Sequence, residues 1–248
     1  MIFIFFLYGL VFGSFFNLVG IRVPVGRSVM TPRSMCTACN HLLTARELIP
    51  VVSYVWQNRS CRVCCSPISP LYPFVEIITA CLFAFAYAKF GFQLPLLKAL
   101  TLISLLMIIF VSDIVYMLIP NKILLFFTYL FLIQWIFLPA SMKMDVLLAG
   151  VMGGGLLILM AAVCKGGIGG GDIKLFILLG FVLGLKEFLV TFILSVWLGA
   201  LGGLLGMMLG KVKRGQPFPF GPFIVVAALL VLFYGEFIFT FYLSLFHN

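Results

Sequence analysis

Residues 105–121, LLMIIFVSDIVYMLIPN, place one carboxylate, Asp113, inside an otherwise apolar run. Residues 164–176, CKGGIGGGDIKLF, place a second, Asp172, between a glycine-rich stretch and another apolar run. An ionisable residue inside a membrane span is costly and therefore indicates a functional site. Two carboxylates that share a site can hold one proton between them and activate a water molecule, as in aspartic peptidases. The two aspartates are therefore candidate catalytic residues, provided that they meet in the folded chain.

The rest of the chain has the composition of a polytopic membrane protein. Of its 248 residues, 64% are hydrophobic and 9% are charged, whereas a soluble domain is about one quarter charged. An apolar run of about 20 residues is long enough to cross a bilayer as a helix. The pattern predicts an all-α fold with about eight transmembrane helices. We expect them at approximately 1–20, 71–88, 99–118, 123–140, 146–164, 171–186, 188–210 and 222–245.

These runs divide the chain into three parts. Residues 1–20 form the first predicted transmembrane helix, residues 21–70 form a small polar insert, and residues 71–248 carry the other helices and both aspartates. The first run has no basic segment before it and no convincing cleavage site. We therefore interpret it as a retained span rather than as a signal peptide.

The basic residues predict the orientation of the chain in the membrane. If the amino terminus is outside, the inner segments carry twelve lysines and arginines and the outer segments carry four. The positive-inside rule favours this arrangement, which makes the polar insert cytoplasmic. The net charge of +9 is not gathered on one soluble face, so we do not expect direct nucleic-acid binding.

This orientation places the two aspartates at a similar depth. Asp113 lies 15 residues after Lys98, and Asp172 lies 14 residues before Lys186. At 1.5 Å per helical residue, both carboxylates lie roughly 21–23 Å from an outer lysine, just below the cytoplasmic surface. The pattern thus permits a pair, and the alternative is that each aspartate is a solvated loop residue.

Five of the six residues in 166–171 are glycine. A stable helix is not expected there, and irregular backbone at membrane depth is tolerated only where protein buries it or water reaches it. We interpret the run as an open stretch through which a peptide approaches Asp172. The alternative is a flexible loop without a further role.

Two C-x-x-C pairs, Cys36 with Cys39 and Cys61 with Cys64, stand 21 residues apart in the insert. This pattern is typical of a structural zinc site, and a reducing cytoplasm disfavours disulfides. An insert of this size has little core, so a bound metal would stabilise it. Cys65 could replace Cys64 as the fourth ligand. His41 is not needed as a ligand and is expected on the surface.

The motifs together resemble the prepilin peptidase (type IV leader peptidase) family, and most closely its competence-type members from Gram-positive bacteria. The shared stretches are Gly13-Ser14-Phe15-Phe16-Asn17, Arg22-x-Pro24, Pro32-Arg33-Ser34, the two cysteine pairs, Glu47-Leu48-Ile49-Pro50, Tyr72-Pro73-x-x-Glu76, Ile119-Pro120-Asn121, Gly169-Gly170-Gly171-Asp172-Ile173-Lys174 and Pro219-Phe220-Gly221-Pro222.

The resemblance implies an aspartic endopeptidase that removes the short basic leader from prepilins or pseudopilins at the cytoplasmic face of the bacterial cell membrane. The substrate would enter the lipid bilayer by an apolar amino-terminal helix. The resemblance also implies methylation of the new amino terminus with S-adenosylmethionine, for which the sequence indicates no binding residues. The family's catalytic aspartates correspond to Asp113 and Asp172, and its zinc ligands correspond to Cys36, Cys39, Cys61 and Cys64.

Two other functions compete with this interpretation. A transporter could use Asp113 and Asp172 as a proton relay, but that would leave the cysteine pairs unexplained, and no internal repeat is visible. A scaffold protein would leave the aspartates unexplained. Glu76, at the start of the second span, contacts either a substrate amine or cofactor, or an arginine with a structural role.

Overall fold

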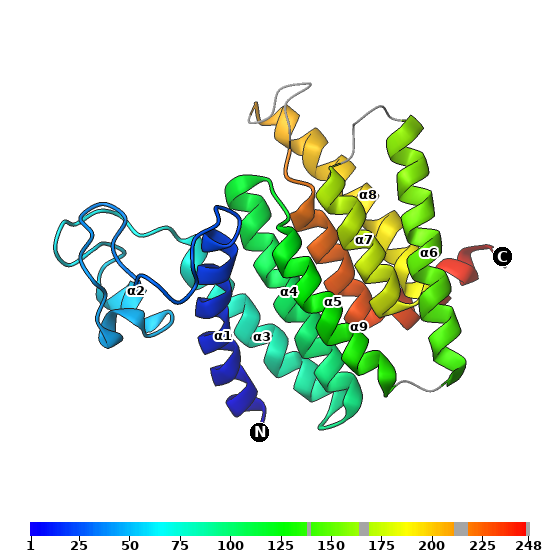
Figure 1. Ribbon diagram of the computed structural model, residues 1–248, viewed down its shortest axis with the longest axis horizontal. Helices are drawn as coiled ribbons and strands as arrows, with labels where there is room; N and C mark the ends of the chain where they lie inside the picture. The colour runs from blue at the N-terminus through cyan, green and yellow to red at the C-terminus, as the bar shows by residue number, and fades with distance from the viewer. Residues whose placement is uncertain (138–139, 164–168, 211–217, 247–248) are drawn as a thin grey trace. The chain divides into compact units, whose positions relative to one another are not determined.

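The computed structural model describes residues 1–137, 140–163, 169–210 and 218–246. Its long elements are all helices, and in these residues β pairing is limited to two isolated bridges. The long helices are α1 (Ile2–Arg22), α3 (Leu71–Phe90), α4 (Leu94–Tyr116), α5 (Asn121–Ile136), α6 (Ala140–Val163), α7 (Gly170–Leu183), α8 (Leu185–Met208) and α9 (Gly221–Phe246) (Figure 1). They correspond one to one with the eight predicted spans.

Five of these helices, among the described residues, are long and apolar enough to cross a membrane: α1, α3, α4, α8 and residues 221–240 of α9. Helix α5 is apolar but has 16 residues, and α7 has 14. The prediction of an all-helical, multi-pass membrane protein is confirmed. The chain folds as two compact units, residues 1–111 and residues 112–248.

The first unit is organised by close contact between α1 and α3, which run side by side (Figure 1). A methyl group added at Gly9 would lie 2.5 Å from the Ala80 backbone, and one added at Gly13 would lie 2.7 Å from the Glu76 backbone. Small residues allow membrane helices to approach to backbone contact, and dispersion then holds them together. The Asn17 amide adds a hydrogen bond of 3.1 Å to the Tyr72 carbonyl.

The insert between α1 and α3 contains two short helices that the sequence pattern did not predict. They are the 3₁₀ helix η1 (Ala45–Leu48) and the α-helix α2 (Val52–Trp56), which lie between the two cysteine pairs in the chain. The Arg22 guanidinium, at the end of α1, donates to the Pro32 carbonyl at 2.8 Å and so closes the loop that leads into the insert.

In the second unit, α7 packs against α6 and α8, and α8 packs against α9. Aromatic rings fill the space between α7 and α8, where Phe176 meets Phe188 and Phe192 edge to face. Glycine again permits close packing, since a methyl group at Gly180 would lie 2.6 Å from the Ala149 carbonyl oxygen.

The end of the sixth predicted span differs from the structure, and this difference changes the distance of Asp172 from the end of its helix. The sixth span was expected to end at Lys186, but α7 ends at Leu183 and Lys186 belongs to α8. The reason is Gly184, whose φ of +96° lies in the left-handed region that ends a helix at glycine. Asp172 is therefore about 11 residues from the end of its own helix rather than 14.

Candidate active site and metal site

Asp113 lies in the last turn of α4, and its side chain is 5% exposed. Its Oδ2 accepts a hydrogen bond of 2.8 Å from the backbone N–H of Gly221, the first residue of α9. The first N–H groups of a helix have no partner within the helix and carry partial positive charge. The start of α9 therefore orients this carboxylate.

Glycine is required at position 221 for a steric reason. A methyl group there would lie 2.7 Å from Oδ2 and 2.8 Å from Cγ of Asp113, closer than atoms in contact allow. This contact accounts for Gly221 in the Pro-Phe-Gly-Pro motif, a position for which the sequence alone indicated no role. Because Gly221 has an N–H donor and no side chain, the backbone of α9 can contact the Asp113 carboxylate. Gly221 and Asp113 are 108 positions apart in the chain.

Asp172 lies in the first turn of α7 and is half-buried. Its carboxylate turns back toward the residue that precedes the helix, since a methyl group added at Gly169 would lie 2.8 Å from Oδ2 of Asp172. An acidic side chain in the first turn of a helix is stabilised by the helix dipole. Asp113 and Asp172 lie in the same unit, at the end of α4 and at the start of α7.

Two further contacts join the segments that carry the aspartates. A methyl group at Gly171 would lie 2.9 Å from Cβ of Ile119, so glycine allows the start of α7 to rest on the turn that follows α4. The Lys174 ammonium donates to Oδ1 of Asn121, the first residue of α5, at 2.9 Å. Two contacts therefore hold the Ile-Pro-Asn motif against the Gly-Gly-Gly-Asp-Ile-Lys motif. They fix the position of the helix ends that carry the two carboxylates.

The glycine run is only partly as predicted. Residues 166–168 lie outside the described residues. Gly169 has the extended backbone of a helix cap, and Gly170 and Gly171 are already helical. The expected irregular stretch therefore stops at Gly169, one residue earlier than the predicted span boundary implied. Of the two helical glycines, Gly171 packs closely against Ile119, whereas a methyl group at Gly170 would have no neighbour within 4 Å.

In the insert, the sulfur atoms of Cys36, Cys39, Cys61 and Cys64 all lie within 4.8 Å of one another. Two of the sulfur separations are 3.7 Å, between Cys36 and Cys64, and 4.0 Å, between Cys39 and Cys61. Tetrahedral zinc with Zn–S bonds of about 2.3 Å separates its sulfur ligands by about 3.8 Å. The four thiols therefore fit a tetrahedral metal ion.

The two cysteine pairs form equivalent turns. The Cys36 N–H donates to the His41 carbonyl and the Asn40 N–H to the Cys36 carbonyl; Cys61 makes the same two bonds with Ser66 and Cys65. Asn40 and Cys65 have φ values of +57° and +56°. Cys65 thus corresponds to Asn40 as the left-handed residue that closes the turn, and its thiol is not in the cluster found among the described residues.

The backbone of each turn also favours thiolates. The N–H groups of Cys39 and Ala38 lower the pKa of Cys36 to about 6, and those of Cys64 and Val63 lower the pKa of Cys61. Such N–H donors stabilise negative charge on sulfur. Crowded thiols cannot all ionise without a cation, and the pKa of Cys64 is correspondingly raised. A divalent metal would remove this conflict.

His41 is half-buried rather than fully on the surface, and its Nε2 lies 3.5 Å from Oε2 of Glu47. The Glu47 carboxylate also accepts from the N–H and the hydroxyl of Thr44, at 2.8 Å each, and these bonds lower its pKa. The result is a capping box on η1. Glu47 and His41 therefore stabilise the insert beside the cysteine turns.

Glu76 is 6% exposed in α3. Its Oε2 accepts a bond of 2.7 Å from the Val51 N–H, and Ser14 is a second partner. If Glu76 had a structural role, its expected partner was an arginine. The partners that the structure shows are instead a backbone amide and a hydroxyl. Glu76 therefore joins the turn before α2 to the first two long helices.

Fold and site together define a multi-pass membrane protein with two buried or half-buried aspartates in its second unit and, in its first, a four-cysteine group that could hold a metal ion. The bacterial peptidase A24 N-terminal domain model matches residues 7–90, and the model of the type IV leader peptidase family matches residues 100–204. The chain belongs to the type IV leader peptidase family.

Relatives match over nearly the whole chain. A prepilin leader peptidase/N-methyltransferase of Bacillus subtilis (strain 168) is 42% identical over 99% of both chains. Proteins of the same name from Aeromonas hydrophila and Legionella pneumophila are 31% and 30% identical, over 96% and 88% of this chain and 92% and 77% of theirs. No solved structure matches this chain at a significant level.

Proposed function

We propose that this protein is an aspartic endopeptidase that removes the leader from type IV prepilins or pseudopilins, with Asp113 and Asp172 as its catalytic pair. The observation that carries the proposal is that the two aspartates lie at adjoining helix ends of one unit, where Gly171 beside Asp172 packs on Ile119 of the turn after Asp113, in a chain of this family. A shared proton between two close carboxylates is the basis of aspartic catalysis.

In the proposed reaction, the ionised carboxylate takes a proton from water while the protonated one donates to the oxygen of the scissile carbonyl. Water adds to the carbonyl carbon, and the C–N bond then breaks as the new amine takes up the proton that the first carboxylate received. The Gly221 N–H occupies Oδ2 of Asp113, so the proposal gives Oδ1 the contact with water. The second carboxylate regains its proton from the tetrahedral diol as the carbonyl re-forms. Water therefore supplies the proton that the amine gains, and no covalent intermediate forms.

The leader is cut at the cytoplasmic face of the bacterial cell membrane, with the amino terminus of the enzyme outside. The twelve-to-four distribution of basic residues supports this orientation. A reporter placed within 211–215 should report the cytoplasm, and one placed after position 248 should report the outside. Both positions lie outside the described residues. The reverse result would put the aspartates at the wrong face.

The four-cysteine group holds zinc in this proposal, as a closed structural site without an open coordination position. Cys36, Cys39, Cys61 and Cys64 are its ligands, which the sulfur separations support. The proposal also includes methyl transfer to the new amino terminus from S-adenosylmethionine. The names of the relatives support this second activity, and competence pseudopilins are the proposed substrates.

The decisive experiment is incubation of the purified full-length protein with a pilin precursor, followed by mass spectrometry of the precursor. Loss of the leader mass would establish the peptidase, and a further gain of one methyl group in the presence of S-adenosylmethionine would establish the transferase. An unchanged precursor, combined with proton-coupled flux across proteoliposomes, would favour the transporter alternative.

A further inference from the structure

The insert exposes a run of large apolar side chains between its two cysteine turns. Leu48 and Ile49 are 41% and 42% exposed, and Val52, Val55 and Trp56 of α2 are 50%, 68% and 69% exposed. Residues three and four apart lie on the same face of a helix. Val52, Val55 and Trp56 therefore form one apolar face, and such a patch on a small polar module marks an interaction surface.

This face is held close to a membrane helix. The Val51 N–H, immediately before α2, donates to the buried Glu76 carboxylate, six residues into α3. Val51 has a φ of +61°, which a β-branched residue rarely adopts. Because local preference disfavours this turn, tertiary contacts such as the Glu76 bond must maintain it. Helix α2 therefore begins at a fixed point beside the start of α3.

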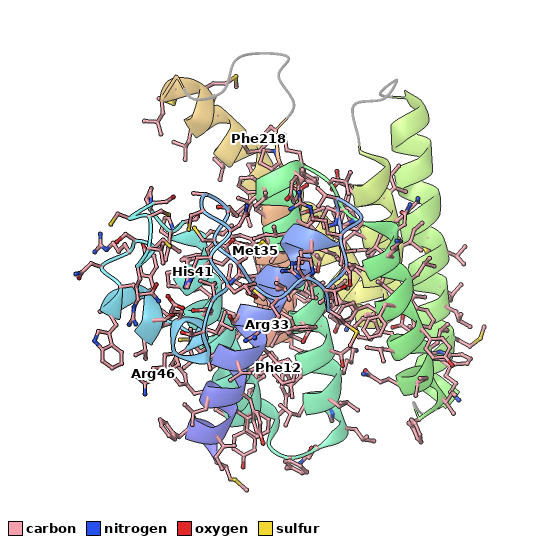
Figure 2. The ribbon with its side chains drawn as sticks, turned by 60° about the vertical axis from the view of Figure 1, so that its left-hand side comes forward. Phe12, Arg33, Met35, His41, Arg46 and Phe218 are labelled. Atoms are coloured by element: carbon pink, nitrogen blue, oxygen red, sulfur yellow. The ribbon has the colours of Figure 1, made fainter. Side chains whose placement is uncertain are left out.

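The figures place the insert beside the first span rather than beyond its end. Helix α2 lies alongside α1 in Figure 1, and both belong to the same unit. Figure 2 shows Arg46 on the insert, to one side of α1, which carries Phe12. Exposed valine and tryptophan are unfavourable in water and favourable at a bilayer interface, so this face of α2 is suited to a membrane surface.

The charge of the insert indicates what kind of surface it meets. Residues 21–70 contain six arginines and a single acidic residue, Glu47. Glu47 is buried and bonded to Thr44, whereas Arg46 and Arg59 beside η1 and α2 are exposed. Exposed arginine next to apolar side chains is the pattern of a segment that lies in the interface of an anionic bilayer. The same charge disfavours a basic peptide as the occupant.

We propose that residues 45–59 form an interfacial anchor that seats the apolar face of α2 among the lipids of an anionic leaflet, with Arg46 and Arg59 on the lipid phosphates. The anchor holds the cysteine module at the membrane surface. It does not depend on the peptidase reaction, because it rests on exposure, charge and the contact between Val51 and Glu76.

Tryptophan fluorescence of the full-length protein in nanodiscs tests the proposal. Lipids brominated near the top of the acyl chain quench tryptophans that lie in the interface. The chain has three tryptophans, so the signal of Trp56 is taken as the difference between the parent and Trp56→Phe. We expect this signal to be quenched in phosphatidylglycerol discs and less so in phosphatidylcholine discs.

Two aspartate substitutions at exposed valines of the insert separate the effect of the α2 face from the effect of an added charge. Val55→Asp puts a charge on the apolar face and should cause loss of Trp56 quenching. Val63→Asp, at a residue that is 62% exposed on the second cysteine turn, should leave the quenching unchanged. Zinc content shows that both variants keep the folded insert.

Unquenched Trp56 in anionic discs would overturn the proposal. Quenching that is equal in the two lipids would overturn the role of the arginines. Quenching that is absent until a prepilin is added would also overturn it, and would instead indicate that the face docks substrate. These outcomes leave cleavage of a precursor in detergent unaffected, so failure of the anchor is distinguishable from failure of the peptidase.

Discussion

The cysteine insert and the aspartate site are assembled over very different distances along the chain. All four thiols lie within residues 36–64, and each turn is closed by hydrogen bonds between residues at most five apart. The aspartate site instead joins Asp113 to Gly221, and Lys174 to Asn121. The insert is specified by local turns and a metal, whereas the aspartate site depends on how four helix ends pack.

This difference predicts different responses to substitution. A structural metal site contributes binding free energy to folding, so losing a ligand acts on stability. A carboxylate pair contributes to the transition state, so losing one member acts on rate. Substitutions in the two sites should therefore differ in whether they change the rate of cleavage or the stability of the insert.

Asp113→Asn and Asp172→Asn should each reduce cleavage of a pilin precursor by about 10²–10⁴-fold or more, because an amide cannot serve as general acid or base. Protein yield, elution profile and zinc content should match the parent. The measurement is the initial rate of leader removal followed by mass spectrometry. Near-normal cleavage by either variant would exclude the pair as the catalytic centre.

Gly221→Ala should reduce cleavage by up to about 10²-fold, because a displacement of about 1 Å at a catalytic group is costly. The added methyl group would overlap the Asp113 carboxylate. Gly203→Ala in α8 is the matched control, since a methyl group there has no neighbour within 4 Å. If the two variants have equal kcat and equal thermal stability, the contact between α9 and Asp113 does not position the carboxylate.

Cys36→Ser should remove most of the bound zinc and destabilise the insert, while residual folded enzyme keeps much of its kcat. Cys65→Asn should retain zinc, because it reproduces Asn40 at the equivalent left-handed position and leaves the four ligands intact. Elemental analysis gives the metal content, and limited proteolysis reports the stability of the insert. A metal-free preparation with full activity and normal resistance to protease contradicts the structural role.

Lys174→Met and Asn121→Ala should each slow cleavage only a few-fold, since one exposed hydrogen bond contributes about 0.5–1.5 kcal/mol. The two residues act through a single contact of 2.9 Å, so the double variant should be no slower than the worse single variant. A double-mutant cycle on kcat/KM measures this coupling. Fully additive losses argue that the two motifs do not act together.

Much of the architecture was predictable because lipid imposes a strong pattern. A span must be apolar for about 20 residues, and two aspartates in such runs stand out. The C-x-x-C spacing likewise predicted the metal site, since ligands on a tight turn are near one another whatever the rest of the chain does. Helices η1 and α2 were missed because each is a single turn held by capping and by Glu76, with no periodic signal of its own.

The sequence by itself determined the class of fold, the four thiols and the two aspartates, because composition, spacing and isolated charges act locally. Only the tertiary structure decided that Gly221 contacts Asp113, that Gly171 rests on Ile119, and that Cys65 closes a turn instead of joining the thiol cluster. The contacts of Gly221 and Gly171 depend on backbone approach to within a few ångströms between distant segments, and the role of Cys65 depends on the φ of one residue in a turn. The spacing of residues along the chain does not predict distances of a few ångströms between segments, because side-chain and backbone packing sets those distances.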